Sequence, residues 1–195
     1  MTITLPRRPM ERLLTIDDVA ELPSELPSGP VHYELEKGRL LIMAPPGDIH
    51  GKAESRIAYY LIHFGDRKGF GTTRSGEAGL VLSRGKYHTL YGVDAFFVAR
   101  EKLPLAVSKE GYVVTIPSIV AEVRSKNDST KRIAEKVATY LEAGVDLVWV
   151  IDPIRKNVTV HKRRGKPQVL SPKDTLTAES IIPSFAVPLA ELFAD

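Results

Sequence analysis

The chain has 195 residues, of which 43% are hydrophobic and 26% are charged, and it contains no cysteine. This length and composition predict one globular domain over residues 1–195 with a core of its own. The lack of cysteine excludes disulfides and thiolate metal sites, and five histidines are too few for a zinc-finger site, so any metal should be bound by oxygen. A net charge of +3 permits nucleic-acid binding without requiring it.

Membrane and targeting segments are not expected. No stretch approaches the roughly 18 uncharged apolar residues of a spanning helix, and no apolar segment follows the arginines of the N-terminus. No internal repeat or long linker divides the chain either. The sequence therefore predicts a cytoplasmic protein without a membrane partner.

The first half of the chain predicts a short helix, a β-hairpin, a long helix and three strands. Thr15 should start the short helix with Asp18 as its capping-box partner. Period-two apolar positions around a Lys37-Gly38 turn predict the hairpin, and apolar residues at helical spacing predict the long helix after the loop APPGDIHG. In order, we expect the short helix before a proline-rich loop at 23–30, the hairpin at 32–36 and 39–44, the helix with its apolar stripe from Ala53 to Phe64, and strands at 70–74, 78–82 and 93–98.

The second half predicts a strand, helix, strand unit after an irregular surface segment at 100–117. The strand at 118–123 is almost wholly apolar, as in the middle of a covered sheet. Asp128 or Ser129 should cap the following helix, and Gly144 should end it. Strands at 146–152 and 157–163 and a tail with a short strand and a terminal helix complete an α/β fold with a mixed sheet flanked by helices.

Two acidic residues interrupt strands that are otherwise apolar. Asp94 lies in YGVDAFFV and Glu122 in SIVAEV, 28 residues apart, so they can meet only on neighbouring strands. Two carboxylates, together with the backbone carbonyl of Val123, are hard oxygen ligands suited to Mg²⁺, with Mn²⁺ as a substitute. Lys136 lies at the border of the apolar stripe of the next helix, from where its ammonium can reach the same sheet edge. The pattern indicates a site for a divalent cation and a phosphate.

Each of these residues also has a structural interpretation. An acidic residue in an apolar strand can form an ion pair, here with Arg124 or Lys136. Arg124, two residues after Glu122, should share its strand face. Glu34 is a candidate third acidic ligand or a solvent-facing hairpin residue, and His50 is a candidate substrate contact or a turn residue. The basic run at 161–166 can follow a phosphate backbone or keep a hairpin tip soluble.

Several segments, in this order, carry a resemblance to a known family. They are YELEKGRLLIM, APPGDIHG, VDAFFV, IVAEVRS, EKVATYLEAGV, LVWVIDP and IIPSFAVPLAELF. Together they resemble the "putative restriction endonuclease" family of cyanobacteria and Deinococcus-Thermus bacteria, within the PD-(D/E)XK nuclease superfamily, over residues 30–193. The resemblance implies a restriction-endonuclease-like core with an N-terminal hairpin extension.

The resemblance also implies roles for individual residues. Asp94 matches the Asp of the PD element, Glu122 the acidic residue of the (D/E)XK element, and Lys136 a lysine moved onto the following helix. The sequence departs from the superfamily pattern at Val93, where proline is usual, and at Arg124, where lysine is usual. An arginine cannot act as a base, so the lysine role passes to Lys136 or is absent.

The expected function is that of a magnesium-dependent endonuclease acting on DNA, as a homodimer. The alternatives are a nucleic-acid-binding or assembly module that has lost catalysis, for which Arg124 is the main hint, and a nuclease of RNA or branched DNA. The sequence has no readable base-recognition element, so it predicts no substrate sequence.

Overall fold

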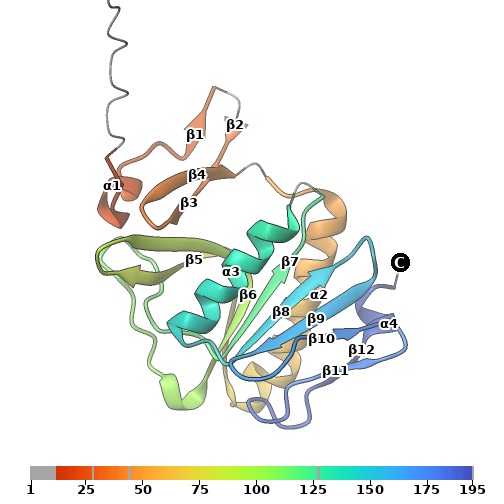
Figure 1. Cartoon of the computed structure of the whole chain (residues 1–195). Helices are drawn as coiled ribbons and strands as arrows, with labels where there is room; N and C mark the ends of the chain where they lie inside the picture. Colours follow the sequence, from red (N-terminus) through yellow and green to blue (C-terminus); the bar gives the residue numbers. More distant parts are fainter. Residues whose placement is uncertain (1–11, 28, 44, 127, 195) are drawn as a thin grey trace, which may run out of the picture.

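The computed structural model describes residues 12–194 apart from 28, 44 and 127. Its centre is an eight-stranded mixed sheet with the strand order β10-β9-β8-β7-β6-β3-β4, and β5 pairs with β6. Figure 1 shows α2 on one face of this sheet and α3 on the other. The strands are β1 (Glu25–Leu26), β2 (Gly29–Pro30), β3 (His32–Glu36), β4 (Arg39–Met43), β5 (Gly71–Arg84), β6 (His88–Ala99), β7 (Ile119–Val123), β8 (Leu147–Asp152), β9 (Asn157–Lys162), β10 (Gln168–Leu170), β11 (Thr175–Thr177) and β12 (Ala186–Pro188). The helices are α1 (Ile16–Ala20), α2 (Asp48–Phe64), η1 (Asp66–Lys68), η2 (Arg100–Lys102), α3 (Thr130–Ala143) and α4 (Leu189–Leu192).

The central strands bury side chains on both faces. In β7, Ala121 packs with the α2 residues Ile57 and Leu61, whereas Val120 packs with the α3 residue Val137. Because neighbouring strand residues point to opposite faces, a strand covered on both sides must be apolar throughout, as β7 is apart from Glu122. The mixed sheet flanked by helices, as predicted from the sequence, is confirmed.

The predicted strand, helix, strand unit is also confirmed. β7 and β8 are parallel, with Val123 opposite Ile151, and α3 connects them. Ser129 is the N-cap of α3, since its hydroxyl accepts a hydrogen bond from the backbone N–H of Arg132. Gly144 ends the helix with a φ of +113°, a left-handed conformation that favours glycine. Parallel pairing brings the ends of β7 and β8 to the edge where α3 begins.

The structure corrects two element boundaries. The expected strands at 70–74 and 78–82 are one strand, β5, whose pairing with β6 is irregular between Ser75 and Ala78. A β-bulge with Gly76 and Glu77 at positive φ accommodates one extra residue opposite Asp94, so the turn-like sequence does not end the strand. The long helix begins at Asp48, inside the APPGDIHG loop, with Gly47 as N-cap. His50 therefore lies in the first turn of α2 rather than before it.

The N-terminal hairpin leaves part of β6 uncovered. β5 occupies one edge of β6, so β3 and β7 share the other edge. β3 pairs only through Leu35 with Leu90, and β7 pairs with residues 95–97, which leaves the segment around Asp94 between them. The hairpin itself and the Thr15 capping box are confirmed, although residue 44 lies outside the described residues. The proline-rich loop contains the short strands β1 and β2, which periodicity did not indicate.

The C-terminal tail covers the α2 face of the sheet. β11 and β12 form a separate two-stranded sheet, and α4 follows directly. Phe185, directly before β12, packs its ring at a tilt against Trp149 of β8, with 5.3 Å between the ring centroids. The predicted terminal strand and helix are present, with β10 and β11 as additional short strands. Across the described residues, every helix is too short or too polar to cross a membrane.

Candidate active site

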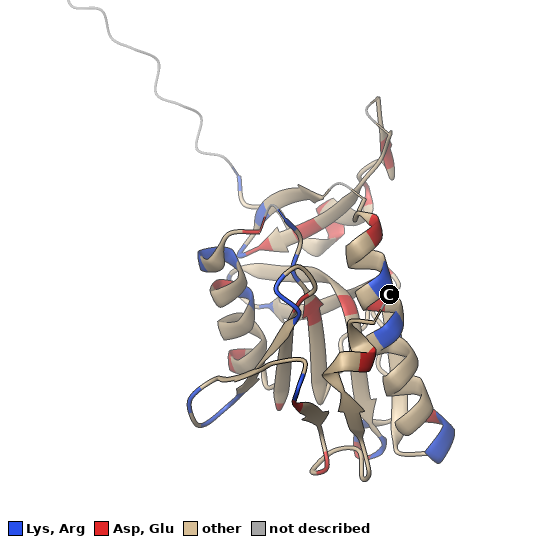
Figure 2. Ribbon diagram, turned by 90° about the vertical axis from the view of Figure 1, so that its right-hand side faces the viewer, with Lys and Arg blue, Asp and Glu red and all other residues tan. Residues whose placement is uncertain are grey.

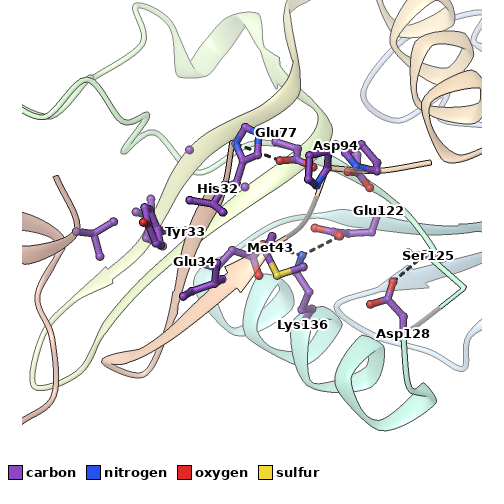
Figure 3. A pocket seen from close by; sticks show the side chains of 18 of the residues that line it. His32, Tyr33, Glu34, Met43, Glu77, Asp94, Glu122, Ser125, Asp128 and Lys136 are labelled. Atoms are coloured by element: carbon purple, nitrogen blue, oxygen red, sulfur yellow. Dashed lines mark hydrogen bonds and ion pairs between the residues drawn. The ribbon is translucent and has the colours of Figure 1, made fainter. Parts of the chain in front are cut away.

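A cavity of about 580 Å³ opens where β6 is left unpaired between β3 and β7. Its walls come from the N-terminal hairpin, the start of α2, the bulge of β5, and the facing side of α3. Figure 3 shows Asp94, Glu122 and Lys136 pointing into this space from three different elements. The three residues singled out from the sequence are thus brought together by the fold.

Asp94 lies on the inner strand β6 and is held in place by the neighbouring strand β7. It is 6% exposed, and its Oδ2 accepts a hydrogen bond from the backbone N–H of Val123 at 2.6 Å. It lies between Val93 and Ala95, opposite the β5 bulge. The interrupted pairing on both edges of β6 leaves room at this position for a functional side chain.

Glu122 and Lys136 form the buried centre of an ionic network. The Lys136 Nζ lies 2.9 Å from Glu122 Oε2 and 3.2 Å from Glu34 Oε1. It also lies 5.0 Å from the ring centroid of Tyr91, a cation–π contact. Burial alone would lower the pKa of Lys136, but the charges of Glu122 and Glu34 outweigh it and raise that pKa. Lys136 therefore carries a positive charge at neutral pH.

Two further side chains fix the carboxylates that contact Lys136. The Tyr140 hydroxyl donates a short hydrogen bond to Glu122 Oε1, and Arg132 Nη2 donates to Glu34 Oε2 at 3.0 Å. Burial, followed by the charge of Glu122, raises the pKa of Tyr140 well above its usual value, so its hydroxyl stays protonated and remains a donor. The sequence indicated Tyr140 only as a core residue. Arg132, Tyr140 and Lys136 lie on one side of α3 at spacings of four residues, a pattern that could have been recognised.

His50 and Glu54 bring α2 into the site. His50 Nε2 lies 3.4 Å from Asp94 Oδ2, and its Nδ1 lies 3.9 Å from Glu54 Oε2. Burial would lower the pKa of His50, but the hydrogen bond and charge of Asp94 raise it. Glu54 in turn accepts a hydrogen bond from the Gly76 N–H at the β5 bulge. The placement of His50 at the cavity agrees with its selection as a candidate, whereas Glu54 was not anticipated.

Glu77 is a site residue that the sequence analysis missed. The bulge holds it at a φ of +56°, an unfavourable conformation for a non-glycine residue, and its carboxylate lies in the cavity near Asp94 (Figure 3). His32 Nδ1 contacts its Oε2 at 3.3 Å. Gly76 is the sequence feature that indicates a bulge here, but a glycine at this position indicates the end of a strand equally well.

Arg124 does not enter this cavity. β7 ends at Val123, and the next residue turns away, so that Arg124 Nη1 lies 3.5 Å from Asp152 Oδ2. Its Nη2 donates to the backbone carbonyl of Asp128 at 3.1 Å. The expectation from strand alternation, that Arg124 shares the face of Glu122, is confirmed, because both lie on the α3 side of the sheet, but the Arg124 side chain points to Asp152 and not into this cavity. Val123 and Ser125, on either side, do line the cavity.

The charges around the cavity fit a divalent cation. Among the described lining residues there are five carboxylates, against the two permanent cations Arg132 and Lys136. His50, Glu54 and Asp94 each offer one ligand atom, and these three atoms lie within 4.8 Å of one another. The buried His50 Nδ1 has no hydrogen-bond partner. Such a donor set is mainly oxygen with one imidazole nitrogen, which Mg²⁺ or Mn²⁺ can accept. The His50 imidazole beside Glu54 and Asp94 departs from the prediction that any metal is bound by oxygen alone.

The raised pKa of Glu122 should make the free energy of unfolding depend on pH when no metal is bound. Burial raises the pKa of Glu122 from 4.5 to about 7, against the opposing effect of Lys136. Between these values the folded state holds a proton that the unfolded chain has lost, so stability should fall as pH rises from about 4.5 to about 7. The expected loss is about 3 kcal/mol. Denaturant unfolding in EDTA at several pH values measures it.

Glu122→Gln should flatten this pH dependence, because glutamine does not titrate. Glu142→Gln, an exposed position on the same helix, is the matched control and should keep the parent profile. An unchanged slope in Glu122→Gln would show that another group binds the proton.

The architecture is that of a restriction-endonuclease-like fold. It is similar to the crystal structure described as "a putative nuclease belonging to DUF820" from Anabaena variabilis ATCC 29413, with a TM-score of 0.74 and 17% sequence identity over 93% of this chain and 98% of that one. Residues 17–190 match the Uma2 family, described as "Putative restriction endonuclease". The chain belongs to this family, which confirms the family and fold predicted from its sequence. A search of curated proteins finds no match.

Proposed function

We propose that the protein is a magnesium-dependent endonuclease that hydrolyses DNA phosphodiester bonds at the cavity described above. The observation that carries the proposal is the convergence of Asp94, Glu122 and Lys136 in one cavity of a chain from a restriction-endonuclease family. Their burial in a mostly apolar sheet would be costly without a functional or ionic partner. Mn²⁺ is the expected substitute for Mg²⁺.

Asp94 and Glu122, with the backbone carbonyl of Val123, would hold the cation, and His50 and Glu54 offer further ligands. When bound, the ion supplies positive charge to the phosphate and lowers the pKa of a water molecule. The hydrogen bond from the Val123 N–H fixes one oxygen of Asp94 and leaves its other oxygen for a ligand. Tyr140 similarly orients Glu122.

Lys136 would stabilise negative charge on the reacting phosphate. Its raised pKa favours a permanently protonated ammonium over a general base. Glu34 and Arg132 keep this ammonium at the cavity even when Glu122 engages a metal, because Glu34 offers an alternative partner at 3.2 Å. A buried, preorganised cation of this kind acts more strongly than one in water.

A binding or assembly module without catalysis is the alternative. It is favoured by the contacts of Glu122, because Lys136 and Tyr140 already engage both of its carboxylate oxygens. A network satisfied in this way can serve stability alone. The homodimer, the cytoplasmic location and the preference for DNA over RNA stay predictions.

Cleavage of labelled duplex DNA with Mg²⁺, compared with EDTA, tests the proposal. The parent protein should cleave in Mg²⁺ or Mn²⁺, and Glu122→Gln, purified in the same way, should be at least about a hundredfold slower. Single-stranded DNA and RNA in parallel reactions identify the substrate class. DNA binding without cleavage in any metal would support the binding module instead.

A further inference from the structure

A second cavity lies beside the first, on the other side of the end of β7. It has a volume of about 340 Å³ and is lined by Arg124, whereas the neighbouring residues Val123 and Ser125 line the first cavity. Ile133 of α3 lines both. The two cavities therefore adjoin each other at the end of β7 and at Ile133.

Two arginines stand at the polar wall of the second cavity. Arg124 and Arg155 both contact Asp152 Oδ2, at 3.5 and 3.6 Å. Two guanidinium groups and one carboxylate give this cluster a net charge of +1. Each guanidinium has five N–H donors, so contact with one carboxylate leaves donors that can bind a phosphate oxygen. Asp152 thus holds the arginines in place without neutralising them.

Apolar side chains form another part of the lining of the same cavity, here called its apolar wall. Ala134 and Val137 of α3, Val150 of β8 and Val169 of β10 contribute to it, and Val169 is 66% exposed. His161 also lines the cavity, and burial lowers its pKa, so it is neutral at pH 7. A free phosphate would gain nothing from the apolar wall. A sugar-phosphate unit, with a charged and an apolar side, matches both walls.

We propose that the second cavity binds a sugar-phosphate unit of the nucleic-acid backbone next to the one at the candidate active site. Arg124 and Arg155 would contact the phosphate, and the α3 and β10 side chains the sugar. This inference rests on the proposed nuclease function and assigns its substrate contacts outside the catalytic cavity. It also gives Arg124 a role in binding instead of the lysine role.

The basic run after β9 offers a matched control. In Figure 2 the lysines and arginines fall on several separate turns and helix ends, so charge alone does not identify a binding surface. The turn after β9 lies at the C-terminal end of α3, away from Arg124. There the Arg163 guanidinium lies against Gly144, the residue that ends the helix. Arg164 and Lys166 on that turn are exposed and carry the same total charge as Arg124 and Arg155.

Binding of a fluorescent DNA duplex at several salt concentrations, with Ca²⁺ replacing Mg²⁺ to prevent cleavage, tests the inference. Each lost phosphate contact should reduce the slope of log K against log salt by about 0.9 and weaken binding roughly tenfold near 0.1 M salt. Because both arginines would contact one phosphate, Arg124→Ala/Arg155→Ala should lose about 0.9 units of slope. Arg164→Ala/Lys166→Ala should keep the parent slope, and Arg124→Lys/Arg155→Lys should restore most of it.

Other outcomes separate this inference from the proposed function. Equal losses in the two double variants would mean that only net charge matters, and would overturn the second cavity as a subsite. Cleavage by a parent protein whose DNA affinity is unaffected by Arg124→Ala/Arg155→Ala would overturn the inference and keep the nuclease. If the folded parent protein, checked by circular dichroism, neither binds nor cleaves nucleic acid, both are wrong.

Discussion

Lys136→Ala should lower single-turnover cleavage by roughly a hundredfold to a thousandfold, while DNA affinity changes much less. The reason is the position of the ammonium, within 3.2 Å of Glu122 and Glu34 and buried in the wall of the cavity. A cation there acts on charge that develops during the reaction. An exposed lysine would add mainly to general attraction for DNA. Rapid-quench cleavage and equilibrium binding, measured on the same duplex, give the two constants.

The controls for this prediction lie on the same helix and at the end of β7. Lys131→Ala removes an exposed lysine one turn earlier and should leave the rate near that of the parent. Lys136→Met keeps the length of the side chain and fills the space that alanine would leave. Both variants leave two buried carboxylates without their partner, so circular dichroism checks that each one folds. Arg124→Ala should show the opposite balance, with weaker binding and a smaller loss of rate. A parent-like rate for Lys136→Ala with an inactive Arg124→Ala would transfer the catalytic role to the arginine.

The position of Lys136 could be anticipated because it depends on local periodicity. The apolar stripe of α3 is set by residues at helical spacing, and Lys136 lies at its border, next to Tyr140. The strands around Asp94 and Glu122 were equally clear, since an apolar strand buried on both faces has few other interpretations. Parallel and antiparallel pairing then brings these three residues together. Their meeting follows from the order of elements rather than from exact boundaries.

The remaining side chains of the site depend on details that a local pattern does not contain. Glu77 reaches the cavity only because a bulge holds it at positive φ, and Glu54 only because α2 begins at Asp48, before its apolar stripe. Arg124 keeps the alternation of β7, since its backbone N–H bonds Ile151, but its side chain turns to Asp152 instead of the cavity. Bulges and strand ends are set by tertiary contacts between distant residues, so a single sequence specifies them poorly.

The second large effect is expected for Asp94. Asp94→Asn should weaken Mg²⁺ binding by at least about tenfold and lower cleavage by roughly a thousandfold, because it removes the carboxylate that contacts His50 and the Val123 N–H in the cavity lined by Glu122. The asparagine oxygen can still accept the Val123 hydrogen bond, so the fold should persist. Calorimetric titration with Mg²⁺ and Mn²⁺ measures the affinity.

The same variant should unfold at an equal or higher denaturant concentration than the parent in EDTA. Burial is the largest cause of the raised pKa values of Glu54, Glu77 and Glu122, and the charge of Asp94 raises them further. Asp94 therefore repels these carboxylates when no cation is present. Asp146→Asn makes the same chemical change at the opposite end of β8, beside Lys102, and should alter neither metal affinity nor cleavage. Parent-like Mg²⁺ affinity in Asp94→Asn would mean that the cation is held elsewhere, and the assignment of Asp94 as a ligand would be wrong.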